Sequence, residues 1–314
     1  MVESSFRLLA SDGAALNVNR WIPDAAPKGI LFISHGMGEH GARYAALAQS
    51  LEADDWVVYA SDHRGHGRTA AETQDLGYLG DGIGWPHLVE DLRLVAQRAA
   101  EDYPGLPIFL YGHSFGTLIA QAFIAHHGAL LAGCALSGMP TPLEPGLKIA
   151  GKAVVSLGML FKGPRGKANL IKGMTFGQYN KAFAPNRTEC DWLTRDEKIV
   201  DRYLADPFCA FTCSYSFYRE TDSCLDYVYG SDSLDGVPKN LPLYFFCGQK
   251  DQVIGSVPAF NAVVQRYRKL GIADIESRIH EGARHEVVNE TSREQVIKEL
   301  RAWLFARRSE SAKA

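Results

Sequence analysis

The sequence predicts an α/β fold with a mostly parallel eight-stranded sheet, helices on both of its faces and an inserted helical segment. Short apolar runs, typical of strands buried on both faces, alternate with runs whose apolar residues recur at helical spacing. The alternation stops at residue 139, where the pattern becomes irregular and mostly helical, and it resumes after residue 238. We therefore expect a core formed by 1–138 and 239–314, with 139–238 inserted at the carboxyl edge of the sheet.

The individual elements follow in chain order. Strands are expected at 6–10, 15–21, 29–34, 56–60, 107–111, 131–137, 241–247 and 274–279. The first two alternate in polarity around a Ser-Asp-Gly turn, which predicts an antiparallel hairpin, and most of the others are continuous apolar runs. Core helices are expected at 43–53, 88–100, 115–126, 258–270 and 292–307, each from its apolar spacing.

The composition is that of a globular protein and argues against several functions. The 314 residues are 46% hydrophobic and 22% charged, with a net charge of −3 and no basic stripe, so no nucleic-acid partner is expected. No stretch reaches the roughly 18 apolar residues of a transmembrane helix, and the first residues do not resemble a signal peptide. We therefore expect a cytoplasmic protein.

The six cysteines do not match a zinc signature, and without a secretory signal they do not predict a disulfide framework. We interpret them as reduced and mostly buried thiols, with a redox or metal cluster as the alternative. They are Cys134, Cys190, Cys209, Cys213, Cys224 and Cys247.

The pentapeptide 112–116, Gly-His-Ser-Phe-Gly, lies between an apolar strand and a helix-like run. A G-x-S-x-G pattern in this context predicts a strained turn that exposes the serine, Ser114, at the N-terminus of the helix. Its glycines are needed because side chains there would collide with the neighbouring strand and helix. The alternative is a glycine-rich turn that carries an ordinary serine.

A serine nucleophile needs a base, and the base needs a carboxylate that orients it. Asp251 follows the strand expected at 241–247, and His285 follows the strand expected at 274–279. Ser114, Asp251 and His285 therefore reach one edge of the sheet from three loops, which predicts a catalytic triad. Its weaker rivals are His280 for the base and Asp222 or Asp226 for the acid, while His113 is interpreted as structural.

An oxyanion hole requires two backbone N–H groups. Phe115, which follows the serine, supplies one candidate, and Met37 in the glycine-flanked loop after strand 29–34 supplies the other. A plain strand-to-helix turn is the alternative for that loop. No metal and no cofactor are expected, because the histidines of this region lack partners at metal-motif spacing and suit hydrogen bonds between loops. These histidines are His35, His40, His63 and His66.

Five motifs, in order, resemble the monoacylglycerol lipase and lysophospholipase branch of the α/β-hydrolases, a sequence class often labelled serine aminopeptidase. They are His-Gly-Met-Gly-Glu-His at 35–40, Asp-His-Arg-Gly-His-Gly at 62–67, the pentapeptide at 112–116, Asp-Gln-Val at 251–253 and Gly-Ala-Arg-His-Glu at 282–286. The resemblance implies the α/β-hydrolase fold and a serine hydrolase of acylglycerols, lysophospholipids or other carboxylic esters. The family's catalytic triad corresponds by this resemblance to Ser114, Asp251 and His285. Its oxyanion hole corresponds to the N–H groups of Met37 and Phe115.

The resemblance also implies that the inserted segment is a helical cap over the pocket. Phe115 departs from the methionine that many members have, but only its backbone is expected to act. The aminopeptidase label finds no support, since no acidic cluster in the insertion is assigned to hold a substrate ammonium. An acyltransferase, an amide or other specialised hydrolase, and a non-catalytic ligand-binding protein remain as alternatives to the ester hydrolase.

The insertion contains an apolar helical stripe with interspersed lysines, which predicts either a helix packed on the core or one that lines an acyl pocket or touches a membrane surface. The stripe comprises Ile149, Ala150, Ala153, Val154, Leu157, Leu160 and Phe161. A second apolar group comprises Phe208, Phe211, Tyr215, Phe217 and Tyr218. Together they predict an apolar pocket for a medium or long acyl group or an aromatic ester. The sequence predicts no oligomeric state.

Overall fold

The computed structural model describes residues 1–70 and 73–311. Its centre is an eight-stranded sheet of order β1-β2-β4-β3-β5-β6-β7-β8, in which β2 pairs antiparallel with β1 and β4 and the other neighbours are parallel. The strands are β1 (Val2–Leu9), β2 (Ala15–Ile22), β3 (Gly29–Ser34), β4 (Trp56–Ser61), β5 (Ile108–His113), β6 (Gly133–Ser137), β7 (Leu243–Gly248) and β8 (Ile275–His280). The predicted α/β architecture, with its N-terminal hairpin, is confirmed.

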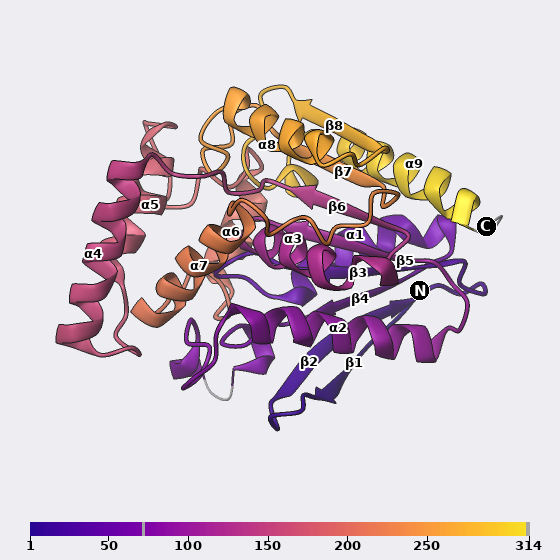
Figure 1. The fold of residues 1–314 in the computed structure, drawn as a ribbon, viewed down its shortest axis with the longest axis horizontal. Helices are drawn as coiled ribbons and strands as arrows, with labels where there is room; N and C mark the ends of the chain where they lie inside the picture. The colour runs from indigo at the N-terminus through magenta and orange to yellow at the C-terminus, as the bar shows by residue number, and fades with distance from the viewer. Residues whose placement is uncertain (71–72, 312–314) are drawn as a thin grey trace.

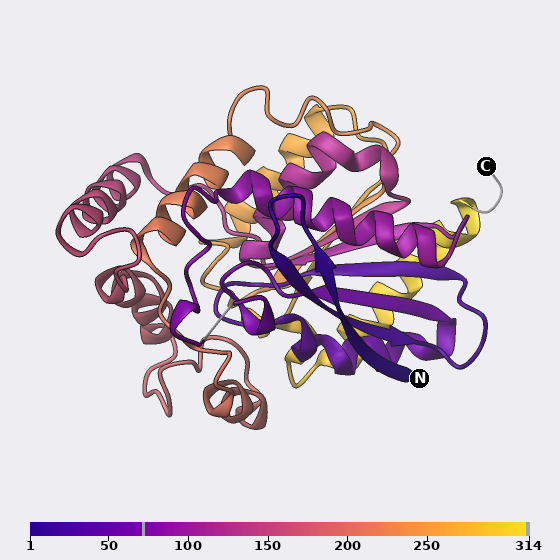
Figure 2. The ribbon, with the colours of Figure 1, turned by 90° about the horizontal axis from the view of Figure 1, so that it is seen from below.

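Two helical layers cover the sheet, one on each face (Figures 1 and 2). Side chains of a strand alternate between faces, so Ile30 and Phe32 of β3 join one core while Leu31 and Ile33 join the other. The first core is closed by α2 (Trp85–Asp102), α3 (Phe115–His127) and α8 (Val257–Lys269), and the second by α1 (Ala45–Leu51) and α9 (Arg293–Ser311). In the register of the parallel strands, Phe32 lies between Tyr59 of β4 and Leu110 of β5. Short 3₁₀ turns lie at Gly41–Tyr44, Glu52–Asp54, Gly67–Thr69, Thr73–Asp75, Gly128–Leu130 and Val287–Asn289.

Four helices lie between β6 and β7, beyond the carboxyl ends of the parallel strands (Figure 1). They are α4 (Pro145–Lys162), α5 (Asn169–Lys181), α6 (Glu197–Ala205) and α7 (Tyr215–Val228). The helix α7 packs on α3 of the core, and α4 packs on α7. The inserted segment therefore stands at the sheet edge where Ser114 is exposed.

Most of the apolar stripe of α4 does not pack on the core. Leu160 and Phe161 are 75% and 79% exposed, and Ile149 and Leu157 are also exposed. The buried contact of α4 is made by Val155 instead. Val154 alone of the stripe is partly buried against the core, so the expectation of core packing is wrong for the rest of the stripe, which lies on the outward face of the helix.

All six cysteines are free and buried, as predicted. None of the described helices combines the length and the apolar character that crossing a bilayer requires.

Candidate active site

Ser114 lies between the end of β5 and the first turn of α3, in a strained conformation. Its φ of 52° and ψ of −124° lie in a region that residues with side chains rarely occupy. The turn is tight, and only glycine fits at position 116. A Cβ there would lie 2.1 Å from the carbonyl oxygen of Ser34. The backbone thus presents Ser114 at the positive end of the α3 dipole, as the pentapeptide predicted.

The loops after β7 and β8 bring Asp251 and His285 together. The Nδ1 atom of His285 lies 2.9 Å and 3.0 Å from the two carboxylate oxygens of Asp251, and both residues are buried. One of these oxygens also accepts the backbone N–H of Val253 at 2.8 Å, which fixes the carboxylate. His280, the rival base, ends β8 and packs its ring against Phe246.

The charge of Asp251 controls the protonation of His285. Burial by itself would lower the pKa of His285, but the negative charge and the hydrogen bond of Asp251 outweigh it, so the pKa is raised. The same hydrogen bond places the proton of the neutral ring on Nδ1 and leaves Nε2 as an acceptor. A base with this orientation can take a proton from a neighbouring hydroxyl.

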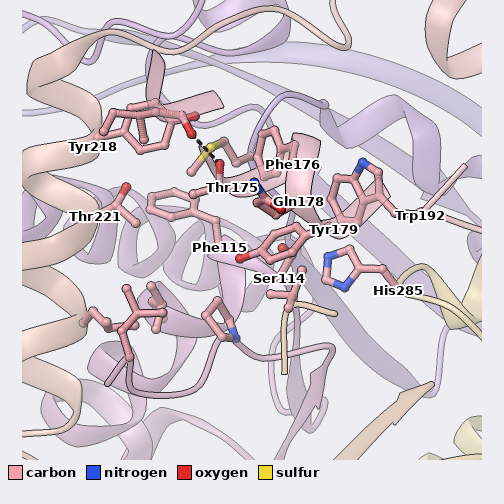
Figure 3. A pocket seen from close by; sticks show the side chains of 18 of the residues that line it. Ser114, Phe115, Thr175, Phe176, Gln178, Tyr179, Trp192, Tyr218, Thr221 and His285 are labelled. Atoms are coloured by element: carbon pink, nitrogen blue, oxygen red, sulfur yellow. Dashed lines mark hydrogen bonds between the residues drawn. The ribbon is translucent and has the colours of Figure 1, made fainter. Parts of the chain in front are cut away.

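Ser114 and His285 line one cavity of about 450 Å³ beneath the inserted segment (Figure 3). The ring of His285 is held between Trp192 and His113, whose ring centroids lie 5.1 Å and 4.7 Å away. His113, expected to be structural, is therefore a direct neighbour of the histidine. Among the described residues, 1–70 and 73–311, Ser114 and His285 form no hydrogen bond with each other. Catalytic hydrogen bonds of this kind commonly tighten only when substrate is bound.

The two candidate oxyanion donors flank the same cavity. Met37 and Phe115 both line it, and within the described part of the chain their N–H groups donate to no other residue. The loop of Met37 is shaped by Glu39, whose carboxylate accepts the N–H of Gly36 at 2.6 Å. The geometry thus leaves both N–H groups available to a ligand.

An ion-pair network behind this loop escaped the sequence analysis. Arg43 donates to Glu286 through two nitrogens, at 2.9 Å and 2.8 Å, and to Glu39 at 2.5 Å. Burial would raise the pKa of Glu286, but Arg43 lowers it to about 2, so the pair is fully charged. The sequence carried a weak signal for it, since Glu39 and Arg43 are one helical turn apart and Glu286 follows His285.

Comparison with known proteins decides the family. The family model described as serine aminopeptidase, S33, matches residues 25–292, most of the chain. The chain belongs to this family. The predicted resemblance to the monoacylglycerol lipase-like α/β-hydrolases is thereby confirmed.

Relatives of this S33 family member span nearly its whole length. It is 27% identical to a monoacylglycerol lipase of Mycolicibacterium smegmatis over 294 residues, which are 94% of each chain. It is 26% identical to a mouse monoglyceride lipase, covering 96% of this chain and 90% of the relative. The solved structure of a thermostable carboxyl esterase from Bacillus coagulans, in complex with glycerol, matches with a TM-score of 0.88 and 27% identity, covering 98% and 99% of the two chains. The S33 family member is accordingly a carboxylic ester hydrolase.

The histidines near the site of this S33 enzyme connect its loops. His35 donates from Nδ1 to the carbonyl of Gly36 at 2.8 Å and accepts the N–H of His63 at 2.9 Å, so it is neutral. Burial lowers the pKa of His63 to about 3 and that of His66 to about 4. His40 is hydrogen-bonded to Asp206 at 2.9 Å.

One set of atoms in the described residues could approach a metal ion, namely those of His40, Asp206 and Cys209. Arg43 lies close enough to Cys209 for its positive charge to act on the thiol. A cation bound there would be repelled by Arg43, which makes the group a poor metal site.

The rival acids on α7 have different surroundings. Asp226 binds two lysines of α4, Lys148 at 2.5 Å and Lys152. Asp222 lines the cavity instead. Neither forms a hydrogen bond with His285, whose Nδ1 is occupied by Asp251.

Proposed function

We propose that the protein hydrolyses carboxylic esters with a medium or long acyl chain, monoacylglycerols among them, through an acyl-enzyme on Ser114. The observation that carries the proposal is the orientation of His285 by Asp251 inside the cavity that exposes Ser114. The names of the relatives support the same reaction class.

In the first half of the reaction, the Ser114 hydroxyl attacks the ester carbonyl carbon and its proton passes to Nε2 of His285. Asp251 keeps the imidazole oriented and stabilises its charged form. The N–H groups of Met37 and Phe115 hold the oxyanion of the tetrahedral intermediate. The proton on His285 then passes to the leaving alcohol as the carbon–oxygen bond breaks, which leaves the acyl group on Ser114.

In the second half, water attacks the acyl carbon and gives its proton to His285. The second tetrahedral intermediate collapses, the carboxylic acid leaves, and the proton returns to the Ser114 oxygen. No bound metal or cofactor is required for this balance of bonds and protons.

The substrate class is proposed from the lining of the cavity. Apolar side chains from both the core and the inserted segment line it, including Leu118 of α3, Val155 of α4 and Ile171 of α5. An acyl chain placed there is removed from water, which contributes about 0.8 kcal/mol for each methylene group. We accordingly assign residues 139–238 as a helical cap over a core of 1–138 and 239–314.

The outward apolar face of α4 supports a transient contact of this cap with a lipid surface. Leu160, Phe161 and Ile149 are all at least 70% exposed, with Lys162 beside them. Apolar side chains with neighbouring lysines are typical of helices that rest in the membrane interface. The contact would deliver a lipid ester to the cavity.

The test is a panel of monoacylglycerols, lysophospholipids and p-nitrophenyl esters of rising acyl length, assayed with the wild type and with Ser114→Ala. We expect turnover that rises with acyl length and is abolished in Ser114→Ala. Turnover that persists in Ser114→Ala would contradict the mechanism, and selective cleavage of lysophospholipids would replace monoacylglycerol as the substrate.

A further inference from the structure

A carboxylate stands in the cavity across from the candidate triad. Asp222 of α7 lines the cavity together with Tyr218, Thr221 and Leu225. Residues three and four apart share a helix face, so Asp222 belongs to the same cavity-facing side as Tyr218 and Leu225. Figure 3 shows that Tyr218 and Thr221 lie on the opposite side of the cavity from His285. The carboxylate therefore faces the part of the cavity that we assign to the acyl chain.

Asp222 is left without a hydrogen bond or ion pair within the described ranges 1–70 and 73–311. The two cap lysines whose charge reaches it, Lys148 and Lys152, are both bound to Asp226. Burial raises the pKa of Asp222 to about 6, and the lysine charges offset only part of that effect. A partly desolvated carboxylate that lacks a partner is unfavourable, and a ligand that supplies one is favoured.

Two threonine hydroxyls that line the same cavity as Asp222 are already engaged as donors. The Thr221 hydroxyl donates to the Phe217 carbonyl at 2.9 Å, and the Thr175 hydroxyl donates to the Ile171 carbonyl at 2.9 Å. The Tyr218 hydroxyl points toward Thr175 (Figure 3). Because the hydroxyl hydrogens of Thr221 and Thr175 are already donated to backbone carbonyls, neither threonine supplies a donor to Asp222, and a ligand that brings one would find an unpaired acceptor there.

We propose that Asp222 is a specificity-determining residue that selects esters whose acyl part carries a hydrogen-bond donor, a hydroxyl or an ammonium, at the level of α7. The proposal rests on the proposed hydrolysis of esters at Ser114. An unsubstituted chain of the same length leaves the carboxylate without a partner and surrounded by methylene groups. Such a chain remains a substrate, but a site that holds an unpaired acceptor discriminates between it and a donor-bearing chain more strongly than apolar contacts alone would.

The experiment compares matched esters. The specificity constant kcat/KM is measured for p-nitrophenyl esters of unsubstituted, ω-hydroxy and ω-amino alkanoic acids over a series of chain lengths. At the length that reaches Asp222, we expect a donor-bearing ester to be preferred by about 10-fold or more over its unsubstituted counterpart. The relative size of the hydroxyl and amino preferences identifies the donor that the site takes.

Two variants isolate the carboxylate. Asp222→Leu should abolish the preference for both donors and raise kcat/KM for the unsubstituted ester. Asp222→Asn, which keeps the size of the side chain, should remove the amino preference and weaken the hydroxyl preference. Asp201→Leu is the matched control, since Asp201 is an exposed carboxylate on α6 outside the cavity lining, and it should leave every ratio unchanged.

Equal kcat/KM within the matched esters at every chain length would overturn the role of Asp222, as would a preference that persists in Asp222→Leu. The unsubstituted esters report separately on Ser114. A wild-type protein that cleaves none of the esters contradicts the proposed function itself, whereas one that cleaves all matched esters equally contradicts only the assignment of Asp222.

Discussion

Arg43 donates hydrogen bonds to both carboxylate oxygens of Glu286, and by doing so it joins two loops of the candidate active site. Arg43 follows the loop that carries Met37, and Glu286 is the neighbour of His285. The second partner of Arg43, Glu39, accepts the N–H of Gly36. One buried guanidinium thus fixes the distance between the candidate oxyanion donor and the candidate base.

Replacing Arg43 by Met tests this connection. The change leaves Glu39 and Glu286 buried without their cation, so we expect the free energy of unfolding in urea to fall by about 3–5 kcal/mol. The control is Lys28→Met, because Lys28 forms an exposed pair with Asp55 and its loss should cost about 1 kcal/mol or less. Similar losses for the two variants would contradict the structural role of Arg43.

The acidic limb of the pH profile should report His285. Only the neutral imidazole can take the Ser114 proton, so kcat/KM should fall as the pH drops through the raised pKa of His285, above the usual value of about 6.5. In Asp251→Asn the charge that raises this pKa is removed, so the limb should move to lower pH. The variant should also lose about 10⁴-fold in kcat, since the imidazole is no longer held in the productive tautomer.

His280→Gln is the control for the pH profile, because His280 lies at the end of β8 and forms no bond with Asp251. Its acidic limb should coincide with that of the wild type. A limb that stays in place in Asp251→Asn but moves in His280→Gln would exchange the roles of the two histidines.

Gly116→Ala should damage both the fold and the site. The added Cβ would meet the Ser34 carbonyl oxygen at 2.1 Å, so we expect a loss of stability of at least about 1–3 kcal/mol and a loss of turnover from displacement of Ser114. Gly173→Ala on α5 is the matched control, since no atom lies within 4 Å of its added Cβ. In that variant the free energy of unfolding, measured by thermal or urea denaturation, should increase by about 0.5–1 kcal/mol. Equal behaviour of the two would refute the tight turn.

The outward face of α4 should mediate lipid contact. In the double variant Leu160→Asp, Phe161→Asp, the fraction of protein that co-sediments with phospholipid vesicles should fall. Each replaced side chain no longer contributes the roughly 1.5–3 kcal/mol that its burial in the membrane interface supplies. Hydrolysis of a short soluble p-nitrophenyl ester should change by no more than about 2-fold, since neither side chain lines the cavity. Phe305→Asp on α9, another exposed phenylalanine, serves as the control and should leave vesicle binding unchanged. Unchanged vesicle binding of the α4 variant would exclude this face of α4 as the site of lipid contact.

Local sequence patterns were sufficient to predict the sheet and the positions of the loops that carry Ser114, Asp251 and His285. Buried strands and the turn around Ser114 depend on residues close together in the chain, so their signals are local. The pairing of Arg43 with Glu286 spans 243 positions and leaves no periodic signal. It became visible only when the loops were placed beside one another.

The orientation of the cap helices likewise depended on tertiary contacts. The stripe of α4 suited packing on the core, but α4 contacts α7 through Gly158, where a Cβ would overlap the ring of Tyr215. That contact turns Leu160 and Phe161 outward. The same contact brings Lys148 and Lys152 to Asp226, while Asp222 lines the cavity. The two acids lie one helical turn apart in the sequence, so the sequence alone could not predict their different surroundings.

The central claim is that Ser114 carries the acyl group during turnover. The most direct measurement is intact-protein mass spectrometry, with peptide mapping, after the wild type and Asp251→Asn are quenched during hydrolysis of a p-nitrophenyl ester. We expect an increase in mass equal to one acyl group, located on Ser114, with p-nitrophenol released in a burst. Turnover without an acylated Ser114, or an acyl group on another residue, would contradict the account.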